Sequence, residues 1–163
     1  QEGQLHALRG RVGTVRCQEV MSRDLVVTAP QALAMEAWHL LSHHQIKALP
    51  VVDEGDKLVG IITLHDLMID RVGRQPRARA EFEQLTVADL MTREVHKARR
   101  YQPLYDLVEA FSDGGLHHMP VVEGDQLVGI ITQSDMVAAL FTLALKPGLT
   151  EDEVPPVSHK NEP

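Results

Sequence analysis

The segment Leu58-Val-Gly-Ile-Ile-Thr-Leu-His-Asp66 decides the fold, because it recurs as Leu127-Val-Gly-Ile-Ile-Thr-Gln-Ser-Asp135. Each copy follows a Pro-Val-Val triplet, which begins at Pro50 in the first copy and at Pro120 in the second. The chain is therefore an internal duplication. Two copies of one short unit are usually related by pseudo-two-fold symmetry, which places equivalent groups on either side of a shared cleft. We expect the functional site to lie in that cleft.

The duplication extends upstream of these segments. Glu19-Val-Met-Ser-Arg-Asp24 matches Asp89-Leu-Met-Thr-Arg-Glu94. The register shifts by one residue only in the acidic, glycine-containing turn after Pro-Val-Val, which is a change that a hairpin tolerates. Each repeat of about 55 residues is too short to bury a good core alone. We therefore expect the two repeats to pack together.

The composition is that of a soluble domain of cytosolic type. The 163 residues are 44% hydrophobic and 4% aromatic, which suits a core of Val, Leu, Ile and Ala. Neither a membrane-spanning run nor a signal peptide is recognisable. The net charge of −7 argues against general affinity for nucleic acid or anionic lipid. The single cysteine, Cys17, excludes an internal disulfide and a multi-cysteine zinc site, and we expect an inert buried thiol.

The apolar periodicity predicts an α/β (α+β) fold in which each repeat has the order β-α-β-β-α. In the first repeat we expect strands at 25–28, 46–52 and 58–63, a helix that begins at Pro30 and a second helix from Asp66. The second repeat should follow the same order, and its last helix should run from Met136 to Leu145 and end at Lys146-Pro147-Gly148.

The chain divides into five segments. Residues 1–16 read as a helical lead-in, 17–72 as the first repeat, 73–86 as a linker, 87–146 as the second repeat and 147–163 as a disordered acidic tail. The arginines between Arg71 and Glu83 read as a solvated linker, because no aromatic residues interleave them as in a nucleic-acid patch. The absence of an initiating methionine suggests a fragment.

The strongest chemical signal is a strand that runs through Gly-Ile-Ile-Thr-x-x-Asp directly into a helix. The free N–H groups and positive dipole of the helix start suit a phosphate, the Thr hydroxyl adds a donor, and Asp can accept hydrogen bonds from a ribose diol. The alternative is that Thr-x-x-Asp is a capping box that only begins the helix. Gly60 and Gly129, which permit close backbone approach, favour a ligand.

Together these motifs closely resemble the cystathionine-β-synthase (CBS) domain, present as a tandem pair over about Cys17 to Leu140. The resemblance rests on Val-Met-Ser-Arg-Asp, the Ile-Lys-Ala-Leu-Pro-Val-Val-Asp strand and the Gly-Ile-Ile-Thr-x-x-Asp turn. The stretches from Glu36 to Pro50 and from Ser112 to Pro120 look more narrowly like the soluble C-terminal region of bacterial HPP-family membrane proteins. That likeness would place the chain in the cytoplasm, at the cytoplasmic face of the inner membrane.

The resemblance implies two clefts between the repeats that bind adenosyl compounds such as AMP, ADP, ATP or S-adenosylmethionine. Ile would sandwich adenine, Asp would hold the ribose and Thr the phosphate. Carried across by motif, one cleft takes Ile130, Ile131, Thr132, Ser134 and Asp135, opposite Gln18, Arg23, Ile46 and Lys47. The mirror cleft takes Ile61, Ile62, Thr63, His65 and Asp66, facing Ala88, Arg93, Leu116 and His117.

Basic residues that precede Pro-Val-Val often bind phosphate in this family. Lys47-Ala48 and His117-His118 occupy those positions here, and neither pair contains Arg. Because histidine titrates near pH ~6.5, we expect the cleft that contains Asp135 to bind AMP-like ligands more tightly as pH falls.

No metal site is predicted from the nine histidines, although His39 and His43 lie one helical turn apart. CBS pairs dimerise through their helices, so we expect a homodimer in which Trp38 lies either at the interface or inside the monomer. We predict a regulatory adenine-nucleotide sensor that needs no cofactor and controls an attached or partner protein, such as a membrane transporter. No recognised motif places a nucleophile, base and orienting acid, so we do not predict an enzyme. A ligand-free dimerisation module is the alternative.

Overall fold

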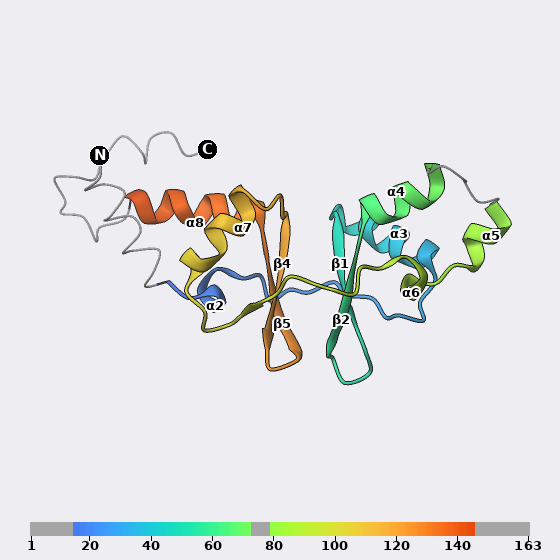
Figure 1. The fold of residues 1–163 in the computed structure, drawn as a ribbon, viewed down its shortest axis with the longest axis horizontal. Coiled ribbons are helices and arrows are strands. Elements are labelled where there is room, and N and C mark those ends of the chain that lie inside the picture. Colours follow the sequence, from blue (N-terminus) through green and yellow to red (C-terminus); the bar gives the residue numbers. More distant parts are fainter. Residues whose placement is uncertain (1–14, 73–78, 146–163) are drawn as a thin grey trace.

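The structure is a computed structural model that describes residues 15–72 and 79–145. It combines helices and short strands in two similar halves that lie side by side (Figure 1). The elements of the first half of the chain are α2 (Cys17–Val20), α3 (Ala34–His44), β1 (Ala48–Val52), β2 (Leu58–Thr63), α4 (Leu64–Val72) and α5 (Arg79–Gln84). Those of the second half are α6 (Val87–Leu90), β3 (Ala98–Arg99), the 3₁₀ turn η1 (Leu104–Leu107), α7 (Val108–Ser112), β4 (His118–Glu123), β5 (Gln126–Thr132) and α8 (Gln133–Leu145).

The predicted hairpins form the centre of each half. β1 pairs antiparallel with β2, and β4 with β5, each with an irregularity after the second residue of Pro-Val-Val. The two hairpin tips also bond to each other, because Leu58 N donates to Asp125 O at 3.0 Å and Leu127 N to Asp56 O at 3.1 Å. The halves are therefore joined by backbone at the turns as well as by side chains.

The strand expected at 25–28 is wrong, since it is reduced to one parallel bridge between Thr28 and Val51. Thr28 N donates to Pro50 O at 3.1 Å, and Val52 N donates to Thr28 O at 2.9 Å. The next bond of such a parallel ladder would need an N–H on Pro50, which proline lacks. Pro120 imposes the same limit on the equivalent β3, which has only two residues.

The helices also differ from the sequence prediction at their starts. The helix expected from Pro30 begins at Ala34, because Leu33 is extended and bridges Thr86. It ends at His44, and its C-cap residue Gln45 adopts the left-handed conformation with φ of 55°. The helices predicted from Asp66 and Met136 begin earlier, at Leu64 and Gln133, because each follows its strand without a loop. The predicted lead-in, the turn at Lys146-Pro147-Gly148 and the acidic tail lie outside the described residues, apart from the end of the lead-in.

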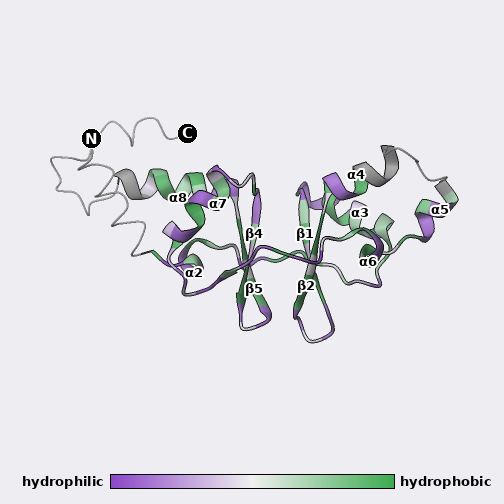
Figure 2. Cartoon of the chain, in the orientation of Figure 1, coloured by the Kyte–Doolittle hydropathy of each residue, from purple (hydrophilic) through white to green (hydrophobic). Residues whose placement is uncertain are grey.

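Each repeat starts with one short helix, and that helix packs on the opposite repeat. α2 lies against β5 and α8, whereas α6 lies against α3 and α4 (Figure 1). One core thus joins Cys17 and Met21 to the second repeat. The other core joins Val87 and Met91, with Phe82 of α5, to the first repeat. Figure 2 shows hydrophobic (green) positions on the helices and strands of both halves, and hydrophilic (purple) positions at the hairpin tips and on several helices and loops.

Candidate functional site

Both Thr-x-x-Asp turns form the capping box that the sequence allowed. Thr63 N donates to Asp66 Oδ2 at 2.9 Å, and Asp66 N donates to Thr63 Oγ1 at 3.1 Å. The second copy repeats this, with 2.9 Å from Thr132 N to Asp135 Oδ2 and 3.2 Å from Asp135 N to Thr132 Oγ1. Because each box uses one carboxylate oxygen, capping does not by itself prevent the other oxygen from accepting a hydrogen bond, and of the two carboxylates Asp135 lines the cleft described below.

The glycines ahead of these turns are required by packing between the repeats, a role that the sequence interpretation did not include. A Cβ added to Gly60 would lie 2.7 Å from Sδ of Met91 and 2.9 Å from Thr92 O. A Cβ added to Gly129 would collide with the side chain of Met21. The repeated Val-Met-Ser and Leu-Met-Thr motifs therefore place a methionine on the glycine of the opposite repeat.

The residue after each methionine pairs with the strand that leads into the Thr-x-x-Asp turn. Ser22 and Ile130 exchange two backbone bonds of 2.9 and 3.0 Å, and Thr92 and Ile61 exchange two of 2.9 Å. The segments that continue from Ser22 and Thr92 consequently run alongside the two turns. Each half-site is thus built from the lead segment of one repeat and the turn of the other, as the family resemblance implied.

The two expected clefts are joined into a single cleft of about 960 Å³ between the repeats. The first half-site combines the segment after α2 with the turn before α8; its residues are Ser22, Asp24, Leu25, Val26, Ile130, Thr132, Gln133, Ser134 and Asp135. The second half-site combines the segment after α6 with the turn before α4; its residues are Thr92, Val95, His96, Ile61, Thr63, Leu64, His65 and Met68. The starts of β1 and β4 also line the cleft, with Gln45, Ile46, Lys47, Ala48, Pro50, Gly115, Leu116, His117 and His118.

Several predicted site residues do not line this cleft. Ile62 and Ile131 are fully buried and belong to the two cores, because alternate residues of a strand face opposite sides. They therefore cannot contact adenine, unlike Ile61 and Ile130. The carboxylate of Asp66 is part-buried in its capping box and does not line the cleft.

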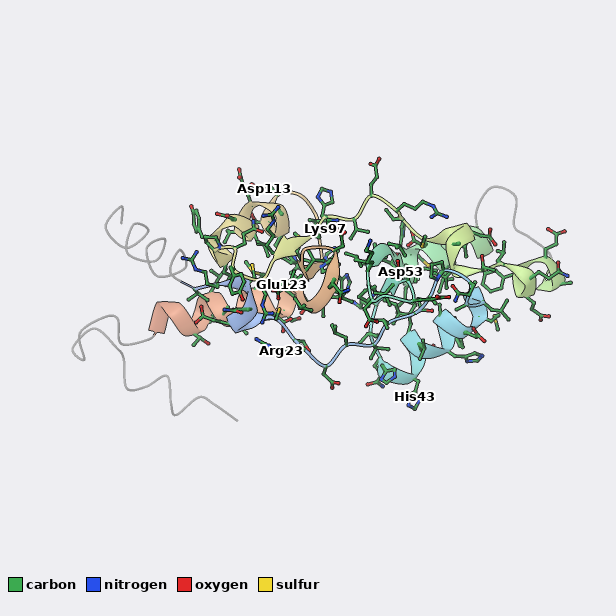
Figure 3. The ribbon with its side chains drawn as sticks, turned by 90° about the horizontal axis from the view of Figure 1, so that it is seen from below. Arg23, His43, Asp53, Lys97, Asp113 and Glu123 are labelled. Atoms are coloured by element: carbon green, nitrogen blue, oxygen red, sulfur yellow. The ribbon has the colours of Figure 1, made fainter. Side chains whose placement is uncertain are left out.

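The upstream residues carried over by motif are held by their own segments. Arg23 Nη2 donates to Gln18 O at 3.4 Å, and Arg93 Nη2 donates to Ala88 O at 3.2 Å. The Gln18 side chain accepts a bond from Arg100 Nε at 3.1 Å. In Figure 3, Arg23 lies beside α2. None of these four lead residues lines the cleft.

Sequence reasoning missed Asp24, Leu25 and Val26, and their counterparts Val95 and His96. The sequence carries no local signal for them, because they are placed in the cleft by the antiparallel bridges of Ser22 with Ile130 and of Thr92 with Ile61, which the structure shows.

A cluster of basic side chains lies at the middle of the cleft. Lys47 and His117 are exposed, while His118 is half-buried on β4 directly opposite Thr132. His117 Nδ1 lies 3.1 Å from Gln133 Oε1. Burial, together with the positive charges of His117 and Lys47, lowers the pKa of His118 below its ordinary value. Since Lys47 comes from the other repeat, the pseudo-two-fold axis brings cations of both repeats to one place.

Other features of the described residues bear on the class of protein. No described helix combines the length and the apolar character needed to cross a membrane. No group of three or more His, Cys, Asp or Glu is placed to hold a metal ion within residues 15–72 and 79–145. His43 projects outward from α3 (Figure 3).

Comparison with known proteins gives two matches to the CBS domain family, at residues 17–71 and 87–142. The CBS domain pair of protein MJ0100, solved with 5′-methylthioadenosine and S-adenosyl-L-methionine, is 31% identical with a TM-score of 0.65, over 78% of this chain and 96% of that one. CBSX2, solved in complex with AMP, is 26% identical with a TM-score of 0.70, over 78% of this chain and 97% of that one.

An inosine-5′-monophosphate dehydrogenase of Methanocaldococcus jannaschii is 29% identical over 83% of this chain but only 25% of the enzyme. The chain spans between about a quarter and three fifths of the length of the first curated relatives it matches. The family matches and the structural neighbours indicate a regulatory module, and they give no catalytic family for this chain.

Proposed function

This chain belongs to the CBS domain family as a tandem pair, and we propose that its central cleft binds an adenosyl ligand and passes that signal to an attached or partner protein. The observation that carries the proposal is the cleft itself, where both Thr-x-x-Asp turns meet the basic cluster of Lys47, His117 and His118. Two solved CBS pairs with adenosyl ligands, CBSX2 and that of MJ0100, support the ligand class.

We assign roles to the first half-site from its geometry. Ile130 and Val26 supply apolar surface for adenine. The carboxylate oxygen of Asp135 that the capping box does not use accepts hydrogen bonds from the ribose hydroxyls. Thr132, Ser134 and the start of α8 face the phosphate, because their hydroxyl groups can donate hydrogen bonds and a helix N-terminus carries positive potential. Ile61, Thr63 and His65 hold the equivalent places in the second half-site.

Calorimetry against AMP, ADP, ATP, S-adenosylmethionine and guanosine monophosphate tests the proposal. Asp135→Ala removes a charged hydrogen-bond acceptor, so we expect a loss of about tenfold or more in affinity for the adenosyl ligand that binds. Asp89→Ala is the control, because Asp89 caps α6 in the same way but lies outside the cleft. If no adenosyl compound binds the unmodified chain, the ligand-free dimerisation module replaces this proposal.

We also propose that the chain forms a homodimer through its helices. Trp38 of α3 is 45% exposed, and Met68 of α4 and Phe141 of α8 are 55% and 67% exposed. Trp38 also lines an apolar groove of about 600 Å³ with Met68 and Phe82. A stable interface of ordinary size should keep the dimer associated at tens of micromolar protein. Sedimentation that shows a monomer at that concentration would contradict the dimer.

A transporter of the HPP class is the specific regulated protein that the sequence suggests. The narrow likeness of the stretches around Pro50 and Pro120 carries this part of the proposal. The sequence of the gene upstream of Gln1 tests it: a membrane-spanning HPP domain in the same reading frame supports the proposal, and its absence there contradicts it.

A further inference from the structure

The charges around the cleft depend on histidine. Its walls carry His65 from α4, His96 from the segment after α6, and His117 and His118 from β4. Their charged neighbours there are Lys47 before β1, Asp24 after α2 and Asp135 at the start of α8. Among the described residues that line the cleft, Lys47 is the one lysine or arginine, against two carboxylates. A histidine that takes up a proton therefore adds positive charge that favours a phosphate.

His118 is the histidine best placed to respond to a ligand. It pairs directly with Thr132, which faces the phosphate in the proposed function, and it is half-buried where His117 is exposed. Burial, and then the neighbouring charges of His117 and Lys47, lower the pKa of His118. A phosphate dianion placed beside Thr132 reverses the sign of that environment, since a nearby negative charge favours the protonated ring.

We propose that a phosphate on the adenosyl ligand and a proton on His118 bind to the cleft together, so that the cleft favours phosphate-bearing adenosyl ligands near neutral pH and loses this preference in base. The inference rests on the proposed function and deepens it, because it names the charge class of ligand and the condition that selects it. It also makes the two half-sites unequal, because the position equivalent to His118 in the first repeat is Ala48.

Calorimetry with AMP and with 5′-methylthioadenosine, which has no phosphate, measures the linkage directly. Each titration is run at about pH 7 and about pH 8.5, where a phosphate monoester with its second pKa near 6 stays a dianion. At each pH, two buffers of different ionisation enthalpy report the protons taken up. We expect AMP to take up between about half a proton and one proton at neutral pH, and 5′-methylthioadenosine almost none.

The ratio of the two affinities should then fall as pH rises, by up to about tenfold per pH unit for one linked proton. His118→Ala should abolish the uptake and the pH dependence, and Ala48 shows that this strand position accommodates alanine. His44→Ala, at the exposed end of α3 and outside the cleft, is the matched control and should change neither.

Proton uptake that persists in His118→Ala overturns the assignment, as does equal uptake with 5′-methylthioadenosine. His117→Ala separates the two neighbouring rings, because loss of uptake there with retention in His118→Ala would move the role to His117. AMP binding with no uptake rejects this inference and leaves the proposed function intact. Failure of both ligands to bind instead rejects the proposed function itself.

Discussion

Ser22 and Ile130 are joined by two backbone hydrogen bonds, 2.9 Å from Ser22 N to Ile130 O and 3.0 Å from Ile130 N to Ser22 O. These bonds tie the start of the first repeat to the last strand of the second. The units that share a core are consequently not the units that repeat in sequence. Residues 17–72 and 87–146 describe the duplication, whereas the cores follow the exchanged helices.

A first prediction follows for fragments of the chain. The core that contains Leu49 and Ile62 draws all its buried residues from the stretch between Ala34 and Met91. A fragment of residues 24–95 should therefore unfold cooperatively, whereas residues 17–72 should not, because they lack Phe82, Val87 and Met91. Urea unfolding followed by circular dichroism compares the two. A sharper transition for 17–72 than for 24–95 would show that the exchanged helix is dispensable.

The contact between Met21 and Gly129 gives a second prediction. A Cβ at Gly129 would lie 2.6 Å from Cγ of Met21, so Gly129→Ala should lower the free energy of unfolding by about 1–3 kcal/mol through overpacking. Gly55→Ala is the control, because a Cβ there meets only Asp53 Oδ1 at 3.6 Å. Denaturant midpoints measure both. Adding Met21→Ala should make the effect of Gly129→Ala smaller, and equal costs in both backgrounds would refute the contact.

The thiol of Cys17 supplies a third prediction. Cys17 is fully buried, and burial, with a smaller contribution from the negative charge of Asp106, raises the pKa of the Cys17 thiol to about 11. The reactive thiolate is thus scarce at neutral pH. Ellman's reagent should react slowly with the folded protein and rapidly after addition of urea. Equal rates in both states would mean that α2 opens freely from the second repeat.

A fourth prediction concerns how His118 makes the stability of the ligand-free protein depend on pH. Folding lowers the pKa of His118, mainly by burial. Below the ordinary histidine pKa of about 6.5, the unfolded chain therefore binds more protons at this residue than the folded protein does. Stability is therefore greatest above that pH and falls as pH drops toward the folded pKa. The melting temperature of His118→Ala should decline less on acidification than that of the unmodified chain. A parallel decline in both would assign the loss to other groups.

A fifth prediction concerns ligand-induced stabilisation. A ligand that binds only the folded state should stabilise it by about 2.7 kcal/mol at a hundredfold excess over Kd. The melting temperature should therefore rise with AMP concentration, and the rise should be smaller in Asp135→Ala. A melting temperature that does not change with any adenosyl compound would favour the ligand-free module.

Local sequence patterns were sufficient for the hairpins and for the turns. β2 has the predicted bounds from Leu58 to Thr63, since its apolar run is closed by a turn on one side and a helix on the other. The inward direction of Ile62 could have been predicted as well, because Gly60 and Ile62 lie on the same face of a strand. The family motif assigned both Ile61 and Ile62 to the cleft, although neighbouring residues of a strand face opposite sides.

The exchange of the short helices was implied by the family resemblance but could not be predicted from local sequence patterns, for a physical reason. Met21 and Met91 lie in nearly identical motifs, so nothing local tells either one which glycine to cover. The choice depends on how the chain between them is routed around both hairpins. The shortened strand at Thr28 is different, since Pro50 was visible and its missing N–H explains the single bridge.

Because of the exchanged helices, the two cores can be completed only one after the other during synthesis of the chain. On the ribosome, residues 24–95 emerge as a contiguous segment that already holds one complete core, so this half can fold while the rest is being made. α2 leaves the ribosome before the other described elements, yet its partner strand, which contains Ile130, is made after most of them. During that interval Met21 and Cys17 remain open to wrong partners, and the nascent chain is most exposed to misassembly just before β5 appears.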